Sequence, residues 1–212
     1  MIEWQAIRRP LAAALLCGMV ASSLQGCVAL AAGGTVMGTL SATDRRTLGA
    51  QTEDRGIVIK GESRIGKLTG DAGHVNVNAY NRRVLLTGEV RDAQMKEAVE
   101  REAAAIEGVQ SVANELEIGL PSTLSSRSND ALITGKVKAS FVDAKDLFAN
   151  SFKVVTERGI VYLLGRVTER EAARGAEVAA GVAGVRKVVK VFEYISEDEL
   201  KRMSMSTEPQ TK

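Results

Sequence analysis

The chain has few of the residues from which catalytic and redox sites are built. Of its 212 residues, one is histidine, His74, and two are cysteines, Cys17 and Cys27. A metal site with several histidine ligands is therefore excluded, and a histidine-based triad has a single candidate. His74 precedes alternating apolar and polar residues at positions 75–79, so we interpret it as a surface residue at a strand end.

Aromatic content and net charge are also low, at 4% and +2. Few aromatic side chains argue against a base-stacking surface, so we expect no nucleic-acid partner. Gly33-Gly34 precedes no Gly-Lys-Ser or Gly-Lys-Thr sequence, which argues against a phosphate-binding loop there. No pair of carboxylates lies in a context typical of a general acid and base. We therefore expect a protein that is not an enzyme and holds no cofactor or metal.

The N-terminus has the pattern of a secretory signal. Arg8 and Arg9 precede an apolar stretch at residues 11–24, which is too short for a spanning helix. The stretch ends in Leu24-Gln25-Gly26-Cys27, which resembles a bacterial lipobox. We expect residues 1–26 to be removed as a lipoprotein signal. An ordinary signal peptide that contains a cysteine is the alternative.

Lipidation of Cys27 would leave the mature chain without a free thiol, because Cys17 leaves with the signal. Val28 follows the anchor, in place of the aspartate that resembles an inner-membrane retention signal. The sequence therefore predicts a lipid-anchored protein on the periplasmic face of the outer membrane.

A repeated pattern organises the rest of the chain. Residues 84–90 and 161–167 each contain an apolar run, a glycine, a charged residue and a valine. The glycines are Gly88 and Gly165, and they indicate a close backbone approach or a bulge within a strand.

Two units follow from this repeat, at residues 53–119 and 129–196. Each is predicted to contain a helix, two strands, a second helix and a third strand, with the first helices at about residues 56–67 and 130–144. Thr168-Glu169-Arg170-Glu171 has the spacing of a capping box, which predicts the start of a second helix. The expected fold class is α+β, with each unit a three-stranded sheet covered by two helices in the order αββαβ.

Three segments flank these units. Residues 27–52 are expected to form a lipidated tether, residues 120–128 a linker that contains proline and serine, and residues 197–212 a polar, disordered tail.

The two units differ in the sign of their charge. Residues 53–119 contain nine Lys and Arg against twelve Asp and Glu, whereas residues 129–196 contain eleven against eight. Basic residues next to a membrane are attracted to anionic lipid by about 1 kcal/mol each. The second unit is therefore the candidate for membrane contact.

The first helix of the second unit has more apolar residues than one buried stripe requires. The stripe expected to face the sheet contains Ile133, Val137, Ser140 and Ala144. Other faces carry apolar residues beside lysines, namely Leu132, Lys136, Lys138, Ala139 and Val142. Such a pattern is typical of a helix at a membrane surface. Alternatively, the first unit or loops bury Leu132 and Val142.

The duplicated unit resembles the BON domain, and a lipobox followed by two such units resembles the dual BON-domain outer-membrane lipoproteins. The matching segments are Leu24-Gln25-Gly26-Cys27-Val28, Ala42-Thr43-Asp44-Arg45-Arg46, Asn78-Ala79-Tyr80, Ser128-Asn129-Asp130 and Val167-Thr168-Glu169-Arg170-Glu171-Ala172. The resemblance implies a non-enzymatic envelope protein that binds anionic phospholipids, such as phosphatidylglycerol and cardiolipin, through the first helix of its second unit. It also implies enrichment at the division site, support of outer-membrane integrity and regulation of septal peptidoglycan cleavage.

Carried over by position, the lipid-facing helix spans about residues 130–143. The residues expected to bind lipid are Leu132, Gly135, Lys136, Lys138, Ala139 and Val142. Relatives can place a tryptophan where this chain has Leu132, and leucine lacks the interfacial hydrogen-bond donor of an indole. The alternative function is a periplasmic adaptor, in which the acidic first unit or an exposed sheet edge binds an envelope or division protein.

Overall fold

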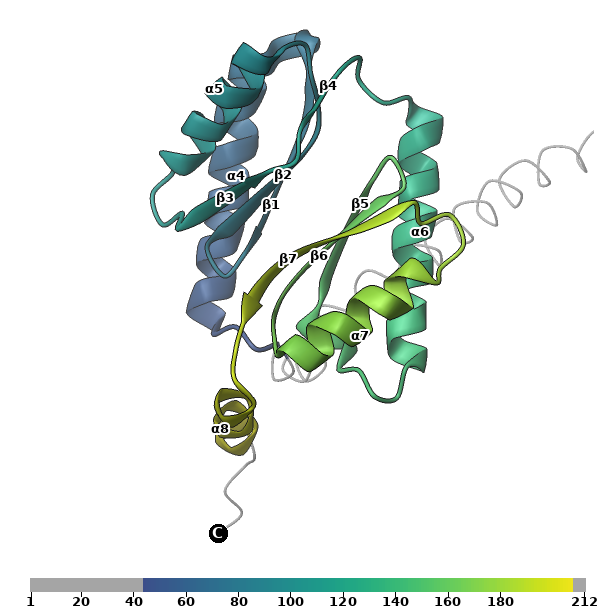
Figure 1. The fold of residues 1–212 in the computed structure, drawn as a ribbon. Coiled ribbons are helices and arrows are strands. Elements are labelled where there is room, and N and C mark those ends of the chain that lie inside the picture. The colour runs from purple at the N-terminus through teal and green to yellow at the C-terminus, as the bar shows by residue number, and fades with distance from the viewer. Residues whose placement is uncertain (1–43, 208–212) are drawn as a thin grey trace, which may run out of the picture. The chain divides into compact units, whose positions relative to one another are not determined.

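The computed structural model describes residues 44–207 (Figure 1). The expected signal, the lipidation site Cys27 and most of the tether lie outside these residues, as does the chain from residue 208 onward. Within them the chain forms two repeats with the same order of elements and then a further helix.

The first repeat consists of two helices, a short 3-10 turn and a small sheet. Its elements are α4 (Leu48–Thr69), η1 (Gly70–Ala72), β1 (His74–Tyr80), β2 (Arg83–Val90), α5 (Ala93–Ala104), β3 (Ser111–Asn114) and β4 (Glu117–Ile118). The second repeat consists of α6 (Leu124–Asp143), η2 (Ala149–Ser151), β5 (Lys153–Glu157), β6 (Ile160–Val167), α7 (Glu169–Ala180) and β7 (Lys187–Tyr194), and α8 (Glu197–Thr207) follows it.

Both sheets have the same topology. The central strand, β2 or β6, pairs antiparallel with the strand before it and parallel with the strand that follows the second helix. In the first sheet that last strand is interrupted, since β3 and β4 both pair with β2. Figure 1 shows α4 and α5 beside the first sheet and α6 and α7 beside the second. The predicted α+β class and αββαβ order are confirmed.

The first helix of each repeat begins earlier than predicted. α4 begins at Leu48 and α6 at Leu124, because the hydroxyls of Thr47 and Thr123 each accept a backbone N–H in the first turn, at 3.2 Å. A threonine cap of this kind supplies a partner for an otherwise unpaired N–H. The predicted linker at residues 120–128 and tether at residues 27–52 are therefore too long at their C-terminal ends. The predicted capping box of α7 is confirmed.

The disordered tail predicted for residues 197–212 is wrong as far as residue 207, because α8 occupies that segment. The Ser196 hydroxyl accepts the N–H of Glu199 at 3.1 Å, and acidic residues in the first turn suit the helix dipole. Two ion pairs connect α8 to the second repeat, Arg166–Glu199 at 2.8 Å and Arg170–Glu197 at 3.6 Å.

A buried aspartate on the first helix of each repeat holds the following hairpin turn. The carboxylates of Asp54 and Asp130 each accept two backbone N–H groups, at 2.7 Å and 2.8 Å respectively. The donors are the two turn residues of each hairpin, Asn81 and Arg82 in the first and Arg158 and Gly159 in the second, and all four have positive φ. The carboxylates thus stabilise a turn conformation that L residues rarely adopt.

Gly88 and Gly165 occupy the close approaches that the sequence predicts. A Cβ atom at Gly88 would lie 2.0 Å from the carbonyl oxygen of His74, and one at Gly165 would lie 2.3 Å from that of Ser151. The space beside each central strand is therefore filled by backbone of the preceding segment.

The sheet faces that the helices leave uncovered pack against each other. Tyr80, Leu85, Tyr162 and Leu164 form a buried apolar cluster that draws on both sheets. Other buried apolar residues of the central strands, among them Leu86 and Leu163, belong to the cores beneath the helices. The central strands are therefore buried on both faces.

Polar contacts surround this apolar cluster. They are Asn76 to Glu157 at 2.7 Å, Asn81 to Glu193 at 2.6 Å, Lys153 to the carbonyl of Ala79 at 3.2 Å and Arg158 to Glu89 at 2.5 Å. Glu89 is fully buried and also accepts the N–H of Ser122 at 2.9 Å. Arg158 also pairs with Glu117 of β4 at 3.4 Å, so this arginine connects the second repeat to two carboxylates of the first.

The segment before α4 also contacts both repeats. Arg45 donates two hydrogen bonds of 2.8 Å to the carboxylate of Glu171, at the start of α7. Arg46 pairs with Asp54 of α4 at 2.8 Å, and its guanidinium lies 4.1 Å from the centroid of the Tyr80 ring. Bidentate pairs between arginine and carboxylate fix orientation as well as distance, so this segment helps to hold the repeats together.

We expect Gly88→Ala to destabilise the first repeat by about 3 kcal/mol or more, because the new methyl group meets backbone and φ is 110°. Gly66→Ala in α4 is the matched control, since nothing lies within 4 Å of a Cβ there. It should stabilise the helix by about 0.5–1 kcal/mol. Urea and thermal unfolding measure both variants, and equal small effects would contradict a close approach at Gly88.

We expect Arg158→Gln to reduce the free energy of unfolding by roughly 1–3 kcal/mol, because it leaves the buried Glu89 without its cation. The double variant with Glu89→Gln should recover part of this loss, since position 89 then carries no buried charge that needs a cation. Arg101→Gln, which breaks the exposed pair with Glu97, should change stability by less than about 0.5 kcal/mol. A double-mutant cycle, measured by chemical denaturation, gives the coupling free energy between the side chains at positions 89 and 158. If the two single effects simply add, the pairing is refuted.

Candidate functional site

The helix α6 presents one face to the core and the opposite face to solvent. Its buried stripe is Ile133, Val137 and Phe141, spaced at four residues. The sequence placed Ser140 and Ala144 in this stripe, but both are only half-buried. Phe141 takes their place because its ring packs against Phe152 of the same core, with ring centroids 5.0 Å apart.

All six residues predicted to bind lipid lie on the solvent side of α6. Leu132 is 65% exposed and Val142 is 72% exposed, and Gly135, Lys136, Lys138 and Ala139 are exposed as well. The alternative that the first repeat or loops bury Leu132 and Val142 is therefore wrong for the part of the chain that the structure describes. Neither lysine forms an ion pair within residues 44–207.

A groove of about 590 Å³ lies between α6 and α7 and extends this face. Lys136 and Ala139 line it from α6, and Arg174 and Glu177 line it from α7. Arg174 is already paired with Asp146 at 2.8 Å and with Glu177 at 2.9 Å. The positive charge available to a ligand on this face therefore comes from the lysines. Sequence reasoning missed the groove, because it depends on how two helices pack.

No helix among residues 44–207 combines the length and the apolar composition that a membrane crossing requires.

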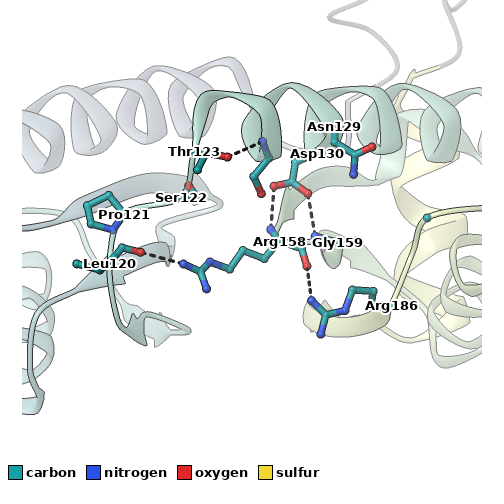
Figure 2. Close-up of a pocket in the computed structure, with 11 residues that line it drawn as sticks. Leu120, Pro121, Ser122, Thr123, Asn129, Asp130, Arg158, Gly159 and Arg186 are labelled. Atoms are coloured by element: carbon teal, nitrogen blue, oxygen red, sulfur yellow. Dashed lines mark hydrogen bonds between the residues drawn. The ribbon is translucent and has the colours of Figure 1, made fainter.

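A second crevice, of about 610 Å³, lies where the linker meets the turn between β5 and β6 (Figure 2). Its charged groups are engaged in the fold. Both carboxylate oxygens of Asp130 accept N–H groups of the turn, and Arg158 donates to the carbonyl of Leu120 at 2.9 Å. Arg186 donates to the carbonyl of Arg158 at 3.4 Å. These groups hold the linker and the turn in place.

His74 is not the surface residue that the alternating pattern indicates. Its side chain is 21% exposed, and its Nδ1 lies 3.5 Å from Oε2 of the buried Glu89. Burial lowers the pKa of His74 below its ordinary value, and the positive charge of Arg127 acts in the same direction. The nearby Glu157 is also buried, and burial raises the pKa of its carboxyl group. This cluster could not be predicted from the sequence, because its members come from both repeats.

Comparisons with known proteins agree with the repeat. The BON domain family matches residues 47–119 and 129–196. The chain is 40% identical over 178 residues to the outer membrane lipoprotein DolP of Haemophilus influenzae, which covers 81% of this chain and 90% of that protein. It is 35% identical over 155 residues to a 21 kDa hemolysin of Actinobacillus pleuropneumoniae, which covers 72% of this chain and 79% of that protein.

Among solved structures, the chain is similar to CdsD, a structural protein of the type III secretion system of Chlamydia trachomatis. The alignment covers 71% of this chain and 98% of that one, with 15% identity and a TM-score of 0.28, which is too low to support an argument. The two family matches and the 40% identity are stronger. The chain therefore belongs to the BON-domain family and has the two-domain organisation of the dual BON-domain outer-membrane lipoproteins.

Proposed function

We propose that this chain is a non-enzymatic outer-membrane lipoprotein whose second BON domain binds anionic phospholipids through α6. In this proposal Cys27 is acylated and anchors the chain at the periplasmic face, and the ligands are phosphatidylglycerol and cardiolipin. The protein supports envelope integrity and is enriched at the division site. The observation that carries the lipid-binding part is the exposure of Leu132 and Val142 beside two lysines that form no ion pair with any residue from 44 to 207.

The energetics favour a weak contact that works together with an anchor. Burial of an exposed leucine or valine in the lipid interface contributes up to roughly 1.5–3 kcal/mol, and each lysine contributes about 1 kcal/mol near anionic lipid. After the cost of ordering the helix at the surface, a few kcal/mol remain, which corresponds to an affinity of about 1 mM. An acyl chain at Cys27 keeps the domain close to the bilayer, so that a weak contact suffices.

A second candidate function is that of an adaptor for an envelope or division protein. Three exposed apolar side chains near the linker favour it, namely Ile118, Leu120 and Leu124. Crosslinking in cells that recovers one stoichiometric protein, with a yield independent of lipid composition and lost in Leu120→Glu, would favour the adaptor over lipid binding.

We expect Leu132→Glu to abolish most binding to vesicles that contain phosphatidylglycerol, without a change in melting temperature, because Leu132 contributes to no core cluster. Ile59→Glu is the matched control, since Ile59 is 62% exposed on the corresponding helix of the first repeat. It should leave vesicle binding intact. Ile133→Glu should instead unfold the second repeat, because Ile133 is buried. Vesicle co-sedimentation of a soluble form that begins at Asp44 measures binding, and equal losses for Leu132→Glu and Ile59→Glu would count against α6.

We expect the pair Lys136→Gln and Lys138→Gln to weaken binding to anionic vesicles by about 2 kcal/mol, roughly 30-fold. The matched control is Lys187→Gln with Lys190→Gln, which removes two exposed charges from β7 of the same domain. Titration at low and high salt should show that the first pair reduces the salt dependence of binding. The proposal fails if the protein binds phosphatidylcholine vesicles as well as anionic ones at low salt.

A further inference from the structure

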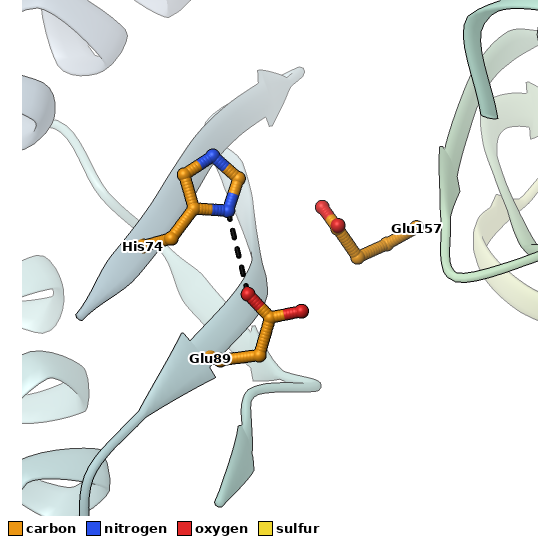
Figure 3. A group of neighbouring side chains, drawn as sticks. All are labelled: His74, Glu89 and Glu157. Atoms are coloured by element: carbon orange, nitrogen blue, oxygen red, sulfur yellow. Dashed lines mark ion pairs between the residues drawn. The ribbon is translucent and has the colours of Figure 1, made fainter. Parts of the chain in front are cut away.

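Three side chains with metal-ligating atoms converge where the two repeats meet. His74 lies directly opposite Glu89 in the antiparallel pairing of β1 with β2, so both side chains leave the same face of the first sheet. Glu157 is the last residue of β5, in the second repeat, and its carboxylate points toward this pair (Figure 3). A ring nitrogen of His74 and one oxygen of each carboxylate lie within 4.8 Å of one another.

Nδ1 of His74 lacks a hydrogen-bond partner in the structure of residues 44–207. The atom is buried and lies 3.5 Å from Oε2 of Glu89. A lone pair on this nitrogen would face a negatively charged oxygen, which is repulsive. A cation between the two atoms would convert this repulsion into two ligand bonds.

Glu157 is a buried carboxylate without an ion pair among the described residues. It is 7% exposed, and Asn76 donates a hydrogen bond of 2.7 Å to Oε2. A buried carboxylate is costly unless it is paired with a cation or protonated. Oε1 of Glu157 is therefore available to a positively charged ligand.

The charged groups around these three side chains leave one carboxylate without a cation among the described residues. Arg158 occupies Oε1 of Glu89, and the N–H of Ser122 shares Oε2, whose second lone pair remains open. Arg127 contributes a further positive charge that acts on His74 and on Glu157, but it forms an ion pair with neither within residues 44–207. With Glu89 already paired, the carboxylate that still needs a countercharge is Glu157.

The distances fit a small divalent transition-metal ion. In a tetrahedral zinc site each ligand atom lies about 2.0–2.2 Å from the metal, so neighbouring ligand atoms are roughly 3.3 Å apart. His74 and Glu89 are already 3.5 Å apart, and since all three ligand atoms lie within 4.8 Å of one another, no separation has to close by more than about 1.5 Å. Rotation of the Glu157 side chain at the end of its strand supplies such a movement.

We propose that His74, Glu89 and Glu157 bind a divalent transition-metal ion of the zinc class and so connect the two BON domains. One imidazole and two carboxylates favour zinc over Mg²⁺ or Ca²⁺, which prefer oxygen ligands alone. Three protein ligands leave a fourth position for water. Because the ligands come from both domains, binding stabilises their contact.

The single histidine makes a direct test feasible. The full chain is produced without a histidine tag, solubilised in detergent, stripped with chelator and titrated with Zn²⁺. In nitrogen-15 spectra of the ring, the Nδ1 signal of His74 should shift and saturate at one equivalent, while Nε2 keeps its proton. The melting temperature should rise with Zn²⁺. No shift at one equivalent, or coordination through Nε2, would overturn the proposal.

Variants assign the carboxylates. His74→Ala should weaken Zn²⁺ binding at least 100-fold in calorimetry, and Glu157→Gln at least tenfold, with the metal-dependent rise in melting temperature lost in both. Glu107→Gln is the matched control, because its carboxylate is 92% exposed, and it should bind as the wild type does. If Glu157→Gln keeps wild-type affinity, the site does not bridge the domains and the proposal fails. The melting temperatures of both variants are compared with that of the wild type without metal, to show that each variant folds. If either variant fails to fold, the nitrogen-15 titration of the wild type decides whether His74 binds Zn²⁺.

Discussion

The contact between the two uncovered sheet faces is the constraint on which the other features depend. In each repeat two helices cover one side of a small sheet, and the other side carries large apolar residues such as Leu85 and Tyr162. A unit of this size buries too little surface to leave that side in water. Each repeat therefore covers the sheet face that the helices of the other repeat leave open, and the two domains stabilise each other.

This contact also decides where polar groups are buried and where surface remains free. Lys153, Glu89 and Glu157 lie around the apolar cluster, and burial lowers the pKa of Lys153 to about 8. Such groups contribute little net stability but disfavour other registers, because a shifted sheet would leave them unpaired. The outer sides of the helices, including that of α6, take no part in this contact and are available to a partner.

The sequence predicted the elements well and their surroundings less well. Three local signals predicted elements that are present in the structure. They are the period of the apolar residues, the capping box at Thr168 and the repeated glycines. The early starts of α4 and α6 were missed because the first turns after Thr47 and Thr123 contain no buried residue and so do not extend the apolar stripe. His74 was misjudged because its strand alternates as if one face met water, whereas that face meets the second sheet. The apolar runs at residues 84–86 and 161–164 carried the missing signal, since strands buried on both faces lose alternation.

The two repeats keep equivalent residues where the backbone depends on them, whereas their outer surfaces differ in charge. Asp54 and Asp130 hold equivalent turns, and Gly88 and Gly165 occupy equivalent close approaches. Exposed apolar residues on the first helix occur in both repeats, so exposure alone does not distinguish a lipid-binding domain. The proposed assignment of lipid binding to the second repeat therefore depends on the sign of the charge, since the first repeat is acidic and anionic headgroups repel acidic groups. The second repeat combines exposed apolar side chains with a basic balance, which is the combination that an anionic bilayer requires.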